Sequence, residues 1–143
     1  MTLVRIILAA VVPFTLGAVS ADSELGRMQG QWTMASGQID GVAVPPQTAK
    51  TSRRVQKGPA LKITVAGQLY LEAKVTLDPS KDPRRIDYDL TAGRGAGKKQ
   101  LGIYAWDGEK LKVCFGEPGG ERPTDFTCPA GSGRTMNVWS KVP

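Results

Sequence analysis

Histidine is missing from this 143-residue sequence, and cysteine occurs only twice. Without histidine, the commonest general base and metal ligand, neither a Ser–His nor a Cys–His nucleophilic pair can be assembled. Two cysteines also fall short of the four ligands of a structural zinc site. We therefore predict a protein that is not an enzyme and that has no catalytic residues, no metal site and no cofactor.

Aromatic side chains and clustered charge are scarce as well. The sequence has three residues each of Trp, Tyr and Phe, and its formal net charge is +6. Lysine and arginine are scattered except at 50–57 and 94–99. A nucleic-acid partner calls for a concentrated basic patch or a row of stacking aromatic rings with basic residues between them. We therefore expect no nucleic-acid partner and interpret the charge as a solvated surface.

A long apolar stretch occurs only once, at the N-terminus. Arg5 precedes a 14-residue apolar stretch, Ile6–Val19, and small residues then lead to Ala21. This order is typical of a secretory signal peptide cleaved after Ala21, with Ser20 as the second choice. A membrane span needs about 20 residues, so an uncleaved anchor is disfavoured. We expect a signal peptide at 1–21, one domain at 22–143 without a membrane span, and export to the periplasm or the cell exterior.

After this segment, hydrophobicity alternates every second residue, which is typical of strands with one wet face. The alternation and its flanking turns predict seven strands, and an eighth is weighed between Thr51 and Lys57. Only Glu24–Gly30 suggests a short helical turn. Sequential strands favour a meander, and closing the sheet removes its sticky edges. The expected fold is all-β, a single antiparallel meander barrel of about eight strands.

Glycine marks the expected hairpins. Asp40-Gly41, Ala66-Gly67 and Asp107-Gly108 each separate two alternating segments, as in tight two-residue hairpin turns. A barrel of about eight strands holds either packed side chains or one small ligand. The candidate lining of such a ligand cavity comprises apolar residues predicted to face inward: Leu61, Ile63, Val65, Leu69, Leu71, Val75 and Ile103.

The two cysteines are a candidate disulfide, because exported proteins commonly contain such bonds. Cys114 and Cys128 are 14 positions apart, and Cys114 is predicted to share a strand face with lysines, where a loop cysteine could reach it. The alternative is a pair of free, partly buried thiols. The sequence favours the disulfide.

Two further patterns resemble catalytic or binding sites. Asp87 and Asp89 share one strand face and are of the residue type of a glycosidase's paired acids, but an outward polar face explains them better. The loop Gly93–Lys99 resembles a phosphate-binding loop but lacks its first glycine and its Ser or Thr. A strand also follows it instead of a helix, so we interpret it as a flexible connection.

The chain resembles an uncharacterised lipocalin-like domain family that is abundant in planctomycete bacteria and often follows a signal peptide. Gly30-Gln31-Trp32 opens the first strand like the G-x-W of lipocalin-type barrels. The more specific motifs follow in order, and the resemblance covers about residues 25–142: Asp40-Gly41, Leu77–Lys81, Ile86-Asp87, Leu101–Tyr104, Asp107–Lys112, Cys114-Phe115, Gly119–Phe126 and Gly131–Gly133. It implies a calycin-type barrel and export. The family has no established activity, so it implies no catalytic residue.

The family pattern also bears on the cysteines. Cys114 stands where the family often has cysteine, whereas position 128 is more often serine or another small residue. A disulfide would then be particular to this chain.

These observations support a function hypothesis and an alternative. The first is an exported small barrel that binds a small apolar ligand inside the barrel. The alternative is an envelope interaction or structural module whose barrel is fully packed, with the Gly116–Gly133 loop as its working surface. Within that loop, Arg122–Phe126 is expected to close one barrel end, with Phe126 as the plug. We expect a monomer in either case.

Overall fold

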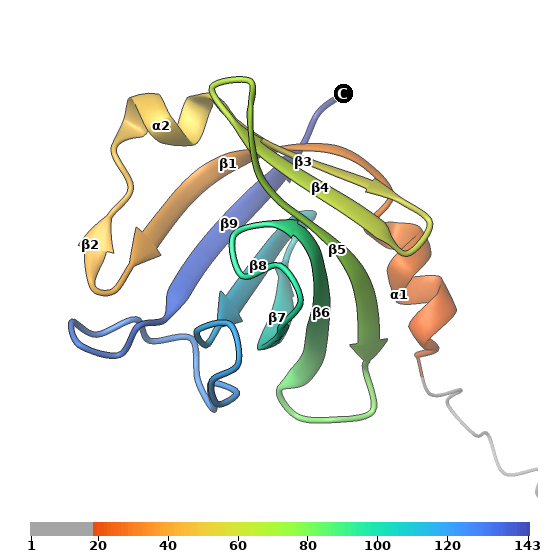
Figure 1. Ribbon diagram of the computed structural model, residues 1–143. Helices are drawn as coiled ribbons and strands as arrows, with labels where there is room; N and C mark the ends of the chain where they lie inside the picture. Colours follow the sequence, from red (N-terminus) through yellow and green to blue (C-terminus); the bar gives the residue numbers. More distant parts are fainter. Residues whose placement is uncertain (1–18) are drawn as a thin grey trace, which may run out of the picture.

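A computed structural model describes residues 19–143, so most of the expected signal peptide lies outside the described residues (Figure 1). The chain forms these elements in order: α1 (Ala21–Arg27), β1 (Gly30–Ile39), β2 (Val42–Ala43), α2 (Pro46–Lys50), β3 (Ser52–Lys57), β4 (Ala60–Val65), β5 (Gln68–Asp78), β6 (Arg84–Gly93), β7 (Lys99–Asp107), β8 (Lys110–Phe115) and β9 (Thr135–Lys141). The weighed eighth strand is present as β3. The sequence reasoning missed β2 and α2, which are very short.

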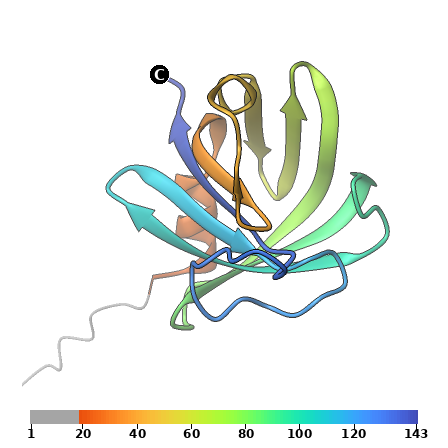
Figure 2. The same cartoon turned by 90° about the vertical axis from the view of Figure 1, so that its left-hand side faces the viewer.

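All strand pairs are antiparallel, and the sheet closes on itself. The strand order is β2-β1-β3-β4-β5-β6-β7-β8-β9, and β9 pairs in addition with β1. Eight strands therefore form the barrel, while β2 extends β1 as a short arm (Figures 1 and 2). This confirms the predicted all-β meander barrel and defines the fold as lipocalin-like.

Alternation of apolar side chains fills the barrel. Every second residue of β5 from Leu71 to Leu77 is buried, and Ile86, Tyr88 and Leu90 of the adjacent strand β6 lie beside them on the same inner face. Large side chains from β1, β7, β8 and β9 complete the core: Trp32, Tyr104, Leu111, Val113, Phe115 and Trp139. Along β4, β5 and β6 the buried residues lie on a single face, so a shift of one residue would expose that set, and this fixes the register.

The tight turns form where glycine permits them. Asp40 and Gly41 both have positive φ, at 48° and 78°, between β1 and β2. Ala66 and Gly67 repeat this geometry between β4 and β5, at 50° and 76°. These are the paired positive angles that a two-residue hairpin needs, as the sequence predicted.

The helix α1 closes one end of the barrel and lies on the opposite side of the molecule from β2 and α2 (Figure 1). It begins three residues before the expected helical turn, because the hydroxyl of Ser20 caps it by accepting a hydrogen bond from the backbone N–H of Ser23 at 3.1 Å. The indole N–H of Trp32 donates to the carbonyl of Met28 at 2.9 Å, which fixes the end of the helix to the core. The expectation that Phe126 plugs a barrel end is wrong, since α1 occupies that place.

Glu24 is the polar centre of this closed end, and it is only 5% exposed. Its Oε2 accepts from Tyr104 at 2.9 Å, from the indole of Trp106 at 2.8 Å and from Arg84 at 3.1 Å. Burial, and the hydrogen bond to Glu24, raise the pKa of the Tyr104 phenol far above its ordinary value. A single carboxylate oxygen therefore accepts all three hydrogen bonds.

The connection between β8 and β9 packs against the outside of the barrel wall (Figure 2). Arg122 makes a two-pronged ion pair with Asp87 on the outer face of β6, and also donates to the carbonyl of Gly102 at 2.7 Å. Phe126 is half-buried there, with the ammonium of Lys112 4.7 Å from its ring centre. This segment therefore covers the wall as a second layer.

Cys128 belongs to this second layer and Cys114 to the outer face of β8 beneath it, and the candidate disulfide is not formed. Cys114 and Cys128 are both buried free thiols. The sulfur of Cys128 lies 3.1 Å from the carbonyl oxygen of Arg134, and that of Cys114 lies 3.8 Å from the carbonyl oxygen of Thr127. Burial raises the pKa of Cys114 to about 11. The alternative of two buried thiols is the arrangement found.

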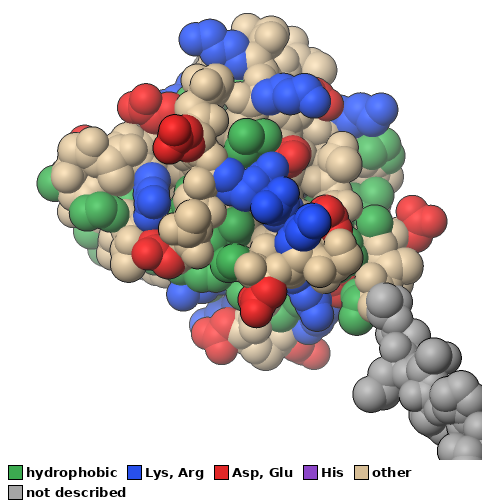
Figure 3. All heavy atoms as spheres, turned by 90° about the horizontal axis from the view of Figure 1, so that it is seen from below, with side chains coloured by type: hydrophobic (Ala, Val, Ile, Leu, Met, Phe, Trp, Pro, Cys, Tyr) green, Lys and Arg blue, Asp and Glu red, His purple; other side chains and the backbone are tan. Residues whose placement is uncertain are grey.

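The surface carries charges of both signs. Seen from below, lysine and arginine side chains are interspersed with acidic ones (Figure 3). Within residues 19–143, no helix has the length and apolar character that crossing a membrane would require.

Candidate functional site

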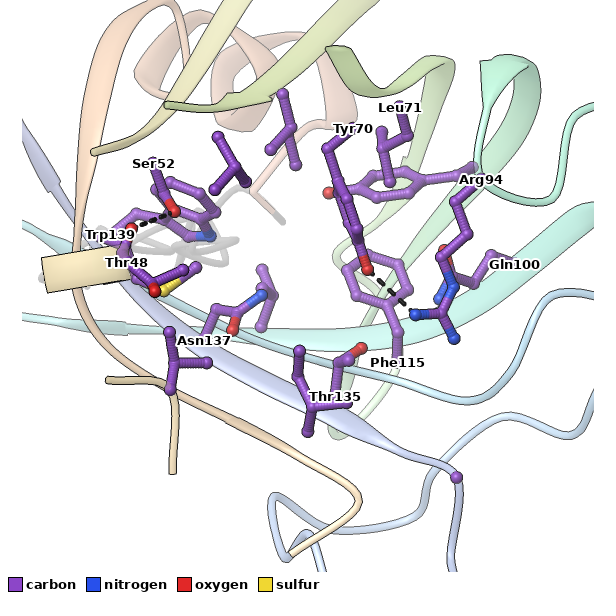
Figure 4. A pocket seen from close by; sticks show the side chains of 18 residues that line it. Thr48, Ser52, Tyr70, Leu71, Arg94, Gln100, Phe115, Thr135, Asn137 and Trp139 are labelled. Carbon is purple, nitrogen blue, oxygen red and sulfur yellow. Dashed lines mark hydrogen bonds between the residues drawn. The ribbon is translucent and has the colours of Figure 1, made fainter. Parts of the chain in front are cut away.

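The barrel is hollow at the end opposite α1. A cavity of about 260 Å³ lies there, and its walls come from both sides of the barrel and from the segment that includes α2 (Figure 4). Most of the lining is apolar, with Ile63, Leu71, Val113 and Phe115 among the contributors. The volume lies just below the range of about 300–1,000 Å³ typical of pockets for drug-sized molecules. A ligand of this cavity would therefore be small.

Tyr70 enters the cavity through a bulge in β5. Ile63 pairs with Leu71 and Thr64 with Leu69, so Tyr70 is an extra residue without a partner on β4. A bulge reverses the alternation of the strand, and bulges commonly redirect side chains at functional sites. Tyr70 and Leu71 consequently both line the cavity, whereas Leu69 turns outward and is 45% exposed.

Arg94 is placed beside Tyr70 by a glycine. Gly93 has a φ of 73°, and a Cβ there would lie 2.3 Å from the carbonyl oxygen of Tyr70. Its absence lets the backbone N–H of Arg94 donate to that carbonyl at 2.9 Å. The guanidinium of Arg94 then donates to the Tyr70 hydroxyl at 3.1 Å (Figure 4). An arginine–tyrosine pair thus stands on the wall, with the arginine solvent-exposed.

A second arginine–tyrosine pair lies deeper. The three inward residues of β3 are all polar: Ser52, Arg54 and Gln56. The fully buried guanidinium of Arg54 donates to the hydroxyl of Tyr88 at 2.6 Å and to Oε1 of Gln56 at 3.2 Å. Tyr88 itself lines the cavity. Among the described residues Arg54 forms no ion pair, although burying an unpaired charge is costly.

Three buried polar side-chain atoms of the described residues have no hydrogen-bond partner. In residues 19–143 they are Nε of Arg54, Oδ1 of Asn137 and Nε1 of Trp139. Asn137 and Trp139 both line the cavity, on the side opposite Tyr70 and Arg94 (Figure 4). Buried polar groups in proteins are nearly always hydrogen-bonded, so the two exceptions that line the cavity mark a place where a further partner fits.

The predicted lining residues fall into three groups. Ile63, Val65 and Leu71 line the cavity, while Leu61 and Val75 are buried in the core but do not reach it. Leu69 and Ile103 do not line the cavity, contrary to the prediction. The bulge at Tyr70 turns Leu69 to the outside, and alternation along β7 places Ile103 on the outer face, where it is buried outside the interior core.

The sequence reasoning missed Arg54, Tyr70, Tyr88, Arg94 and the pair Asn137 and Trp139 as site residues. One signal was present for Arg54. Arg53 and Arg54 are adjacent, and adjacent residues of a strand face opposite ways. If 51–57 is a strand of a closed barrel, one of these two arginines must point inside.

No Asp or Glu belongs to the cavity wall, and the described residues contain no cluster of three or more His, Cys, Asp or Glu that could hold a metal ion. Asp87 is paired with Arg122 and Asp89 with Lys99, and neither lines the cavity. The wall combines apolar surface, two tyrosines and positive charge.

The chain matches no family model, no curated protein and no solved structure. The fold alone therefore defines its class, a closed eight-stranded antiparallel barrel of the lipocalin-like type with one end covered by a helix and a cavity at the other.

Proposed function

We propose that this protein is an exported small-molecule binding protein that holds a small, largely apolar ligand in the open end of its barrel. The observation that carries the proposal is the cavity of about 260 Å³, which a fully packed barrel would not contain. Native interiors rarely leave voids much larger than a water molecule, so an apolar space of this size needs an occupant or a reason.

In this proposal the end closed by α1 contributes to stability, and the opposite end binds the ligand. The helix α1 and the paired groups around Glu24 close one end, so the other end is free to stay open. The resemblance to exported lipocalin-like domains and the N-terminal signal pattern support a location outside the cytoplasm. Cleavage after Ala21 would remove the Ser20 cap and the first residue of α1 but keep Glu24 in the mature chain.

Native mass spectrometry of the protein purified from its own host tests this function. We expect a bound small molecule that denaturation releases. Val65 lines the cavity, so Val65→Phe should fill part of the space and reduce the bound fraction. Thr64→Phe, one residue away and outside the cavity lining, is the matched control and should retain the ligand. A bare polypeptide mass in the wild type and in both variants would contradict the proposal.

The alternative is an interaction module, and one observation favours it. Ile39 at the end of β1 and Val42 in β2 are 42% and 69% exposed, so the arm beside the cavity presents apolar surface. Because Ile39 also lines the cavity whereas Val42 does not, Val42→Ser alone separates the functions. Loss of a pulled-down envelope partner, with ligand retained in the mass spectrum, would identify the arm as a docking surface; loss of neither would leave ligand binding as the function.

A further inference from the structure

A buried positive charge lies directly behind the cavity wall, and no acidic residue among residues 19–143 forms an ion pair with it. Arg54 is fully buried and forms no ion pair among residues 19–143, and its Nε has no hydrogen-bond partner. Its contacts are with neutral groups, the Tyr88 hydroxyl and Gln56. Nothing in the described core neutralises this guanidinium.

The Tyr88 hydroxyl connects that charge to the cavity. Its oxygen accepts the 2.6 Å hydrogen bond from Arg54, so its own hydrogen is free to be donated to another acceptor. Because Tyr88 lines the cavity, an acceptor inside the cavity can receive that hydrogen. A phenol polarised by a guanidinium is a better donor to an anion than an isolated phenol is.

A second unused donor faces the same space. Nε1 of Trp139 is buried, lines the cavity and has no acceptor. An indole nitrogen can only donate, so its missing partner must be an acceptor. Two donors and a nearby positive charge, with no acidic side chain in the lining, favour an anionic acceptor, while the unpaired Oδ1 of Asn137 is left to accept from a further donor such as water.

We propose that the ligand of this cavity is an apolar monocarboxylic acid, bound with its carboxylate inward toward Tyr88 and Trp139 and neutralised by Arg54. This inference rests on the proposed function and adds the ligand's chemical class and orientation. The apolar lining takes the hydrocarbon body. In this orientation the exposed Arg94 at the cavity wall lies at the hydrocarbon end and contributes little to affinity.

Three probes of equal chain length test the class: octanoate, 1-octanol and octylammonium, titrated at neutral pH with tryptophan fluorescence as the readout. We expect octanoate to bind at least tenfold more tightly than octanol, and octylammonium to bind most weakly. Equal binding of octanoate and octanol, or preference for octylammonium, would overturn the inference and leave the proposed function standing. Failure of all three probes to bind would instead count against the proposed function.

Variants test the orientation. Arg54→Met keeps an apolar chain of similar length, and we expect it to bind octanol as before while losing the preference for octanoate. Should Arg54→Met fail to fold, Tyr88→Phe removes only the connecting hydroxyl and should reduce the preference severalfold. Arg94→Gln should change octanoate affinity less than threefold, as should the exposed control Arg85→Gln. Loss of the preference in Arg94→Gln but not in Arg54→Met or Tyr88→Phe would place the carboxylate at the mouth and refute the inward orientation.

Discussion

The two ends of this barrel differ in whether their buried polar groups have hydrogen-bond partners. At the end closed by α1, one carboxylate, that of Glu24, accepts hydrogen bonds from three side chains. At the open end, Trp139 and Asn137 keep unpaired polar atoms, and Arg54 keeps an unpaired Nε. A folded chain normally satisfies such atoms. The comparison teaches that the closed end pairs its polar groups within the chain, whereas the open end leaves polar atoms unpaired that the proposed ligand would satisfy.

The largest effect is expected for a substitution that removes the hydrogen bonds of the closed end. Glu24→Ala removes the acceptor of Tyr104, Trp106 and Arg84, and leaves buried donors unpaired. We expect a loss of about 3–5 kcal/mol in the free energy of unfolding, as for breaking a buried charged network. Urea unfolding measures it, and Glu109→Ala, in an exposed turn, is the control with an expected change below about 0.5 kcal/mol. A loss for Glu24→Ala no larger than that of the control would mean that the closed end does not depend on its carboxylate.

Alkaline pH should lower the free energy of unfolding through the buried thiol of Cys114, which lies on the outer face of β8. The pKa of Cys114 is raised to about 11 in the folded protein from an ordinary value of 9.0. The unfolded chain therefore loses this proton first, and the stability that the thiol contributes is full below pH 9 and falls as pH rises to 11. We expect a loss of about 2 kcal/mol from this group across that window.

The pH prediction is checked by urea unfolding at several pH values from 8 to 11. Tyr104 at the closed end acts in the same direction, because its pKa is also raised. Cys114→Ala should flatten the decline by about the contribution of the thiol and leave the Tyr104 share. A stability that rises with pH, or a slope unchanged in Cys114→Ala, would refute this assignment.

Two matched substitutions, one at each end, should differ by about 1 kcal/mol in their effect on the free energy of unfolding. Trp32 and Trp139 are each 1% exposed, but only Trp32 uses its indole N–H, donating to the carbonyl of Met28. Trp32→Phe and Trp139→Phe lose the same ring volume. We expect Trp32→Phe to be the less stable variant by about 1 kcal/mol, the typical net value of a hydrogen bond. Thermal or urea unfolding of the ligand-free variants decides it, and equal losses would mean that the indole bond is not what distinguishes the ends.

Period-two alternation and turn chemistry predicted most of the barrel. The patterns of β4, β5, β6 and β8 have one apolar face each, and glycine marked the turns between several of them. These are local signals, and a closed meander needs little beyond them. The predicted strands and the fold class could therefore be taken from the sequence.

The cavity could be predicted only in part, because its key placements are not local. The bulge at Tyr70 depends on the pairing of two strands, and it exchanged Leu69 for Tyr70 in the lining. Ile103 is buried by a distant connection on the outer face, so its hydrophobicity carried no sign of which side it faces. Glu24 resembled an ordinary surface residue of a helical turn, since its three donors come from strands 60 or more positions away.

The polar interior face of β3 was hidden for a different reason. Around Arg54 both faces of the strand carry polar or charged residues, so no apolar stripe shows which face points inside. Hydrophobic patterning locates cores through their apolar residues, so it cannot identify a strand that places a charged residue in the core.

The most direct test of the contrast between the two ends uses the three tryptophan indole groups. In a two-dimensional ¹H–¹⁵N NMR spectrum, each indole N–H gives one signal, and Trp→Phe variants assign them. Trp32 and Trp106 donate at the closed end, and only Trp139 lacks an acceptor. Adding octanoate should shift the Trp139 signal and leave those of Trp32 and Trp106 in place. An unmoved Trp139 signal at saturating octanoate, or a shift confined to Trp32 or Trp106, would contradict the account.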